Sequence, residues 1–220
     1  MSRGGAAVAF VVSVLAAAGC GSDPSASPAP DAVEVRAAGC SAVDTLATGT
    51  SVGDGLVLTV AHALHGADSV TANGRPATVV ALDDRLDAAL LAVRPPTPDS
   101  GPVALADRAP AGPARVVTID GPRPTTVSRV VGASVDVDGT GATSASGSTF
   151  VRRRVLELSR SLEAGDSGAP VVDRRSQLIG MVFATSTEGE RSYAVAVDEL
   201  APFVRQGRAS TTPVDLGPCR

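Results

Sequence analysis

The chain has 220 residues, and its 44% hydrophobic content is enough for one large or two small domains with a buried core. The net charge is -4, and there is one Tyr and no Trp, so we expect no nucleic-acid partner. All 19 basic residues are Arg. The absence of Lys excludes a Ser-Lys dyad, a Schiff-base lysine and a P-loop lysine.

The N-terminal residues 1–19 have the pattern of a signal peptide, with Arg3 followed by an apolar run over 6–18. That run is too short to span a bilayer comfortably as a helix. Because a small residue precedes Cys20, as in a bacterial lipobox, we expect lipid attachment at Cys20 and export to the cell membrane. Cleavage without lipid and an uncleaved anchor are the alternatives. Residues 20–32 then form a flexible tether to the membrane.

If Cys20 carries lipid, Cys40 and Cys219 remain as an even pair outside the cytosol, where disulfides form. A bond between them would close nearly the whole domain and stabilise it by roughly 3–5 kcal/mol on the chain-entropy account. Two free buried thiols are the alternative.

Short runs of Val, Leu, Ile and Thr, separated by Gly, Pro and Asp, predict many antiparallel strands. Turn signals at 53–55 and 73–74 predict two hairpins. The expected strands are 48–52, 56–60, 70–71, 77–82, 115–119, 125–138, 150–158, 169–172, 178–185 and 192–197. A Gly/Ser-rich stretch at 139–148 is expected to be a mobile loop.

The pattern favours an all-β fold of two packed antiparallel six-stranded β-barrels with a short C-terminal helix. Asp198 is the expected cap of that helix and Gly207 its stop. The expected folded domain, 33–220, divides into an N-terminal barrel (about 33–94), a linker (95–99), a C-terminal barrel (about 100–197), the helix (198–207) and a disulfide-tied tail (208–220).

Residues 165–170, Gly-Asp-Ser-Gly-Ala-Pro, present one serine among small residues suited to an oxyanion hole. A serine is a weak nucleophile until a base takes its proton. His62 lies in Leu-Thr-Val-Ala-His-Ala, and Asp87 opens the apolar run Asp-Ala-Ala-Leu-Leu. The chain order His, Asp, Ser matches one known order of the catalytic triad. Backbone N–H groups of Gly165 and Ser167 are the expected oxyanion donors.

Other residues compete for these roles. His65 is the second histidine of the chain, and we expect it on the surface rather than as the base. Asp83 and Asp84 have the composition of a solvated turn. Residues 152–154, three consecutive arginines, are expected at a strand edge, with an interaction with anionic headgroups as the alternative.

These motifs resemble those of trypsin-like (chymotrypsin-fold) serine peptidases, in particular the bacterial branch with the HtrA-type proteases and membrane-anchored, disulfide-containing relatives. The resemblance covers about 33–207, with a further match near Cys219. It departs from the family pattern at Val60, Ala88 and Ala169, and none of these changes removes a catalytic group. The resemblance implies a chymotrypsin-like two-barrel fold and the triad His62, Asp87 and Ser167.

The resemblance also implies further site residues. In the family, a buried positive group holds the aspartate at 166; since this chain has no animal-type activation sequence, an arginine or a hydrogen-bond set is expected there. The floor of the primary pocket falls on Ser161 and its wall on Phe183, Ala184 and Thr185. Without a carboxylate at the floor, uncharged side chains are the expected substrate residues.

The expected function is a serine endopeptidase of the bacterial cell envelope that acts on proteins or peptides without a cofactor or metal. A non-enzymatic or latent binding module with the same fold is the alternative, although no triad residue is lost. A peptidase active only within an assembly is another. An α/β-hydrolase esterase is disfavoured because its triad order is Ser, Asp, His.

Overall fold

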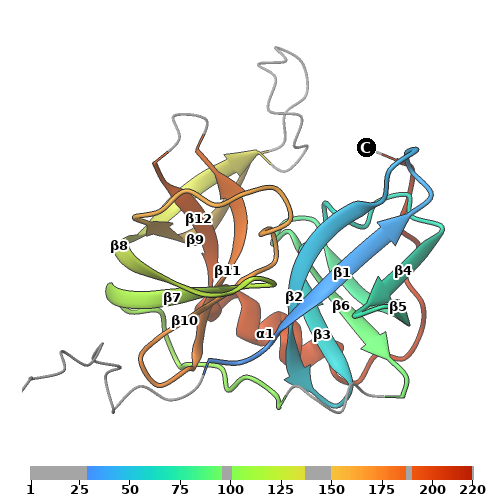
Figure 1. Cartoon of the computed structure of the whole chain (residues 1–220), viewed down its shortest axis with the longest axis horizontal. Helices are drawn as coiled ribbons and strands as arrows, with labels where there is room; N and C mark the ends of the chain where they lie inside the picture. Colours follow the sequence, from blue (N-terminus) through green and yellow to red (C-terminus); the bar gives the residue numbers. More distant parts are fainter. Residues whose placement is uncertain (1–28, 96–100, 137–149, 187–189, 220) are drawn as a thin grey trace, which may run out of the picture.

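The computed structural model describes residues 29–95, 101–136, 150–186 and 190–219. In these segments the chain forms twelve strands and one helix, arranged as two β-barrels side by side (Figure 1). The expected all-β fold is therefore confirmed. The expected signal peptide, Cys20 and the 139–148 loop lie outside the described residues.

The first barrel is a closed antiparallel sheet in the order β1-β2-β3-β6-β5-β4. Its strands are β1 (Ala32–Ala38), β2 (Thr45–Gly53), β3 (Leu56–Thr59), β4 (Ser69–Ala72), β5 (Arg75–Asp83) and β6 (Ala88–Val93). Two tight turns shape its hairpins: Asp54 and Asn73 adopt positive φ angles of 58° and 48° beside glycines. Both hairpins were predicted from these turn residues.

The second barrel is closed in the order β10-β11-β12-β9-β8-β7. Its strands are β7 (Gly112–Thr118), β8 (Gly121–Asp136), β9 (Phe150–Leu158), β10 (Pro170–Val172), β11 (Leu178–Thr185) and β12 (Ser192–Ala196). The bounds of β9 and β11 are those expected from the sequence. The other four differ from expectation by a few residues at their ends, where strand assignment is least sharp.

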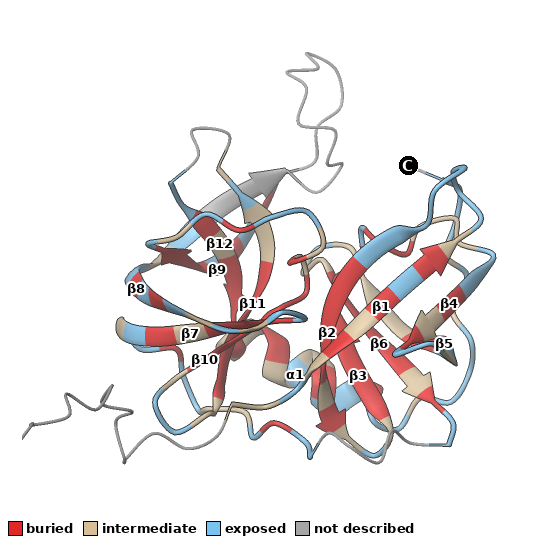
Figure 2. Cartoon of the chain, viewed as in Figure 1, coloured by how far each residue is buried: buried red, intermediate tan, exposed pale blue. Residues whose placement is uncertain are grey.

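Helix α1 (Val197–Gly207) joins the cores of the two barrels. Its Val197 packs into the core of the second barrel, whereas Leu200 and Val204 pack into the core of the first. A Cβ at Gly207 would lie 2.4 Å from the Cδ1 of Leu90, so glycine lets the helix end approach β6 without displacing that side chain. Buried residues accordingly line both barrels and the helix between them (Figure 2).

The expected helix cap is wrong. Ala196 occupies the N-cap position and makes no side-chain capping bond. The carboxylate of Asp198 instead accepts a hydrogen bond from the backbone of Ala109 (3.1 Å) and pairs with Arg154 (2.8 Å). The Asp198 carboxylate therefore binds residues distant in sequence instead of capping its own helix.

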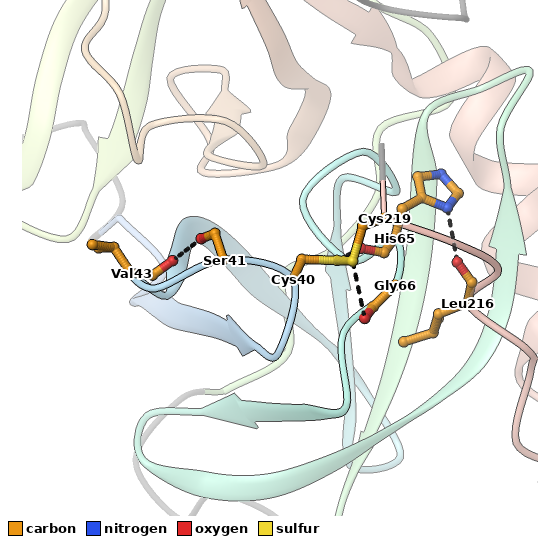
Figure 3. The surroundings of a disulfide bond; sticks show 7 residues. All are labelled: Cys40, Ser41, Val43, His65, Gly66, Leu216 and Cys219. Carbon is orange, nitrogen blue, oxygen red and sulfur yellow. Dashed lines mark hydrogen bonds between the residues drawn. A yellow bond between two sulfur atoms is a disulfide. The ribbon is translucent and has the colours of Figure 1, made fainter.

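The tail after α1 runs back along the first barrel. Val214 donates a backbone hydrogen bond to Val79 (2.9 Å), and Leu216 accepts one from Gly66 (3.1 Å). The Cys40–Cys219 disulfide then joins the tail to the end of β1, which confirms the expected pairing (Figure 3). The tail is thus fastened to the barrel that carries His62.

Candidate active site

His62 and Asp87 lie together because the strands that precede and follow them are paired. The register of β3 and β6 places Thr59 opposite Ala89. His62 follows Thr59 by three residues, and Asp87 precedes Ala89 by two, so both lie beyond the same end of the pair. Asp87 Oδ2 is 2.7 Å from His62 Nδ1, and Asp87 Oδ1 accepts a hydrogen bond from the His62 backbone (2.9 Å).

The turn that presents Asp87 is built by a neighbouring aspartate. Asp83 Oδ1 accepts hydrogen bonds from the backbone N–H groups of Arg85 (2.8 Å) and Leu86 (3.1 Å). Asp87 itself has a φ of 53°, a left-handed conformation that Asp tolerates better than most residues. Asp83 therefore shapes the turn and Asp87 contacts the histidine, as the sequence suggested.

Ser167 lies in the turn between β9 and β10. Gly165 has a φ of 97°, a backbone conformation that favours glycine. In the described part of the chain, the N–H groups of Gly165 and Ser167 donate no hydrogen bond, and Ser167 and His62 are not hydrogen-bonded to each other. The two N–H groups are thus available to an acceptor.

The first barrel contacts this turn directly. Thr48 of β2 donates its backbone N–H to the carbonyl of Ser167 (2.7 Å). A Cβ at Gly168 would lie only 1.9 Å from the Thr48 carbonyl oxygen. Since any side chain would clash there, Gly168 is required where the two barrels touch.

Asp166 has both an arginine partner and a hydrogen bond, the two kinds of contact expected there. The carboxylate is buried and lies 3.7 Å from the guanidinium of Arg123 on β8. It also accepts a hydrogen bond from the backbone of Glu163 (3.0 Å). The sequence did not identify Arg123 itself, because its distance from Asp166 along the chain gives no signal of the contact.

Arg153 is a second residue that the sequence did not single out as part of the site. It is only 3% exposed, and it donates from Nη1 to the carbonyl of Leu86 (2.8 Å), next to Asp87. Its guanidinium carbon lies 5.0 Å from the ring centroid of Phe183, and its Nε has no partner among the described residues. Arg153 therefore brings a buried positive charge from β9 to the His62–Asp87 pair.

Three influences set the pKa of His62. Burial opposes the charged imidazolium and lowers the pKa, but the hydrogen bond and negative charge of Asp87 raise it more, so the net pKa lies above 6.5. The positive charge of Arg153 acts in the opposite direction to Asp87 and lowers it. Asp87 therefore favours the protonated imidazole, and Arg153 disfavours it.

His65 is not on the surface, and that expectation is wrong. Its side chain is 7% exposed, with Nε2 2.7 Å from Asp84 and Nδ1 3.1 Å from the carbonyl of Leu216 (Figure 3). The tail covers this histidine, and the contact cannot be read from nearby sequence. His65 therefore links the tail to the turn that carries Asp84.

The expected pocket residues occupy one end of β11 and the segment before the nucleophile. Ser161 and Thr185 are exposed, whereas Phe183 and Ala184 are partly buried. The hydroxyl of Thr185 donates to the carbonyl of Leu162 (3.2 Å), which joins the end of β11 to the segment that holds Ser161. The residues assigned to floor and wall are therefore neighbours.

Residues 47–181 match the family described as "Trypsin-like peptidase domain". The match covers more than half of the chain, and the fold and the His62–Asp87 pair agree with it. The chain belongs to the trypsin-like peptidase family.

Individual relatives are bacterial proteases. The chain is 32% identical over 185 residues to "Serine protease Rv3671c" of Mycobacterium tuberculosis strain H37Rv, covering 78% of this chain and 44% of that protein. It thus spans less than half the length of this relative. The crystal structure of the active form of the Rv3671c protease superposes with a TM-score of 0.74 at 24% identity, over 94% of this chain and 99% of that one. The HtrA-type protease AlgW, with a tripeptide, matches with a TM-score of 0.60 at 19% identity, over 81% and 60%.

The charge of Arg153 should be visible in the titration of His62. In Arg153→Met the positive charge is lost, so the imidazolium is less opposed and the pKa of His62 should rise further above 6.5. In Arg153→Lys the charge is kept, and the pKa should stay nearer to that of the unaltered protein. NMR titration of the His62 ring measures both.

The carboxylates of Asp87, Asp83 and Glu199 also act on Arg153, and they are unchanged in both variants. The comparison of Met with Lys therefore isolates the charge. A pKa of His62 that falls or stays constant in Arg153→Met would contradict the assignment.

Proposed function

We propose that the protein is a serine endopeptidase of the cell envelope that hydrolyses peptide bonds with His62, Asp87 and Ser167. The observation that carries the proposal is the His62–Asp87 pair, with 2.7 Å between Nδ1 and Oδ2, in a chain of the trypsin-like peptidase family. The N–H groups of Gly165 and Ser167, which donate no hydrogen bond within the described residues, support it.

In the proposed acylation step, Ser167 Oγ attacks the carbonyl carbon of the scissile bond while His62 Nε2 takes the hydroxyl proton. The carbonyl oxygen becomes an oxyanion, which the N–H groups of Gly165 and Ser167 stabilise. Collapse breaks the C–N bond, the leaving amine takes the proton from His62, and an acyl-enzyme remains.

In the proposed second step, His62 takes a proton from water, whose oxygen attacks the acyl carbon. Collapse returns the proton to Ser167 Oγ and releases the carboxylic acid. Asp87 holds the proton on Nδ1 of His62, which leaves Nε2 free as a base, and it stabilises the imidazolium formed in each step. The raised pKa of His62 is the equilibrium signature of that stabilisation.

Replacing the nucleophile or the base should abolish activity. Ser167→Ala and His62→Ala should each lower kcat on a fluorogenic peptide by at least about 1,000-fold, because the triad acts as a unit. Ser167→Ala should also lose labelling by a fluorophosphonate probe. Melting temperature checks that both variants are folded.

His65→Ala is the matched control for the base. It removes the hydrogen bonds of His65 with Asp84 and Leu216 and should lower stability, but the folded protein should keep its kcat. Activity retained without Ser167, after contaminating proteases are excluded, would refute the mechanism. Absence of labelling in the unaltered protein would favour the binding-module alternative.

The substrate preference follows from the proposed pocket. Ser161 at the floor offers no carboxylate to a buried Arg or Lys of the substrate, which would bear an uncompensated desolvation penalty. Arg191 is paired with Glu157 (2.9 Å), a carboxylate that Arg129 also contacts (2.7 Å). We therefore expect small or medium uncharged residues before the scissile bond.

A peptide-library cleavage profile tests this preference, and Ser161→Asp supplies the matched variant. The unaltered protein should disfavour Arg and Lys, whereas Ser161→Asp should gain cleavage after them because the new carboxylate compensates the cation. Dominant cleavage after Arg or Lys by the unaltered protein would overturn the assignment.

The proposed location is the outer face of the cell membrane, with lipid on Cys20. The support is the sequence pattern of residues 1–20. Among the residues that the structure describes, none belongs to a helix long and apolar enough to cross a membrane.

Mass spectrometry of the membrane fraction should find an N-terminus at Cys20 that carries a diacylglyceryl group. Cys20→Ala should release the protein from that fraction, because the proposed anchor is then lost. A mature protein that begins at another residue in both forms would refute lipidation.

A further inference from the structure

The nucleophile turn receives two hydrogen bonds from one residue of the opposite barrel. Besides its backbone bond to Ser167, Thr48 donates its side-chain hydroxyl to the carbonyl of Gly165 (2.8 Å). Thr48 is 0% exposed. The two bonds hold the carbonyl groups of the residues directly before and after Asp166.

The carbonyl of Gly165 and the N–H of Asp166 belong to one peptide group. That N–H donates to the carbonyl of Glu163 (3.1 Å), so the turn itself holds one side of the peptide group. Thr48 Oγ1 holds the other. Because Gly165 has no Cβ, its backbone can rotate at little energetic cost when that restraint is lost.

Thr48 is itself fixed from the strand that leads to His62. Thr59 donates its hydroxyl to the carbonyl of Thr48 (2.7 Å), and both side chains are buried. Three hydrogen bonds thus run from β3 through β2 to the turn of Ser167. The bonds connect the segment of the proposed base with that of the proposed nucleophile.

We propose that Thr48 is a positioning residue whose hydroxyl holds the peptide group between Gly165 and Asp166. Fixing this group also fixes the two flanking peptide groups, so that their N–H groups, on Gly165 and Ser167, point at the developing oxyanion. The inference rests on the proposed peptidase function. Donors aimed at the oxyanion act mainly on the transition state, so their misorientation lowers kcat more than it raises KM.

The same strand supplies a matched control. Thr50 lies two residues from Thr48, on the same face of β2, and is also 0% exposed. Its hydroxyl has no hydrogen-bond partner among the described residues. Thr50→Val therefore makes the same chemical change in the same barrel without removing a bond to the turn.

The experiment measures kcat and KM for one fluorogenic peptide in the unaltered protein and three variants. Thr48→Val should lower kcat about 10-fold or more, equivalent to about 1.4 kcal/mol in the barrier, with KM changed less than about 2-fold. Thr48→Ser keeps the hydroxyl and should stay within about 3-fold of the unaltered kcat. Thr50→Val should be unchanged. If Thr48→Val does not fold, Thr48→Ala, which also lacks the donor, takes its place.

The outcomes separate this inference from the proposed function. If the unaltered protein neither cleaves peptides nor reacts with a fluorophosphonate, the proposed function fails. If it does both, and folded Thr48→Val keeps its kcat, the role of Thr48 is refuted while the peptidase function stands. The role of Thr48 would also be refuted if Thr50→Val lost as much kcat as Thr48→Val, or if Thr48→Val raised KM without lowering kcat.

Discussion

The structure depends on one backbone contact between the barrels, where the carbonyl of Thr48 lies against Gly168. No other residue type fits at Gly168, since a Cβ would overlap the oxygen of Thr48. The contact brings β2 close enough to bond both Gly165 and Ser167. Two separately closed sheets are thereby coupled at the place where the proposed chemistry occurs, so neither barrel holds a complete site.

Buried charge is the second constraint at this interface. Arg153 is only 3% exposed, and burying a guanidinium costs free energy unless opposite charge and hydrogen-bond acceptors surround it. The carbonyl of Leu86 and the nearby carboxylate of Asp87 offset part of this cost for Arg153, while its Nε has no partner among the described residues. Asp87 is consequently shared between His62 on its own barrel and Arg153 on the other. The position of each barrel therefore influences the proton affinity of the imidazole.

The sequence predicted what is encoded locally. Alternation and turn residues located β9 and β11 at their observed bounds, and the motif order identified His62, Asp87 and Ser167 as candidates. Residues whose role depends on distant partners were missed or misplaced. Thr48 was seen only as part of a strand, Arg153 was grouped with its exposed neighbours, and His65 was expected at the surface because the covering tail is about 150 residues away. The expected cap at Asp198 failed for the same reason, since Ala109 and Arg154 bind its carboxylate.

The disulfide gives the chain a particular covalent topology. Cys40 and Cys219 are 179 residues apart, so β2 to β12 and the helix lie inside one closed ring, whereas β1 of the first barrel lies outside it. A single cut of the backbone within that ring opens it but releases no fragment. The two pieces remain tethered at an effective concentration on the order of millimolar, which favours their reassociation. A fragment is therefore released only after a second cut between Cys40 and Cys219, and the two pieces left by a single cut separate covalently only after reduction of the disulfide.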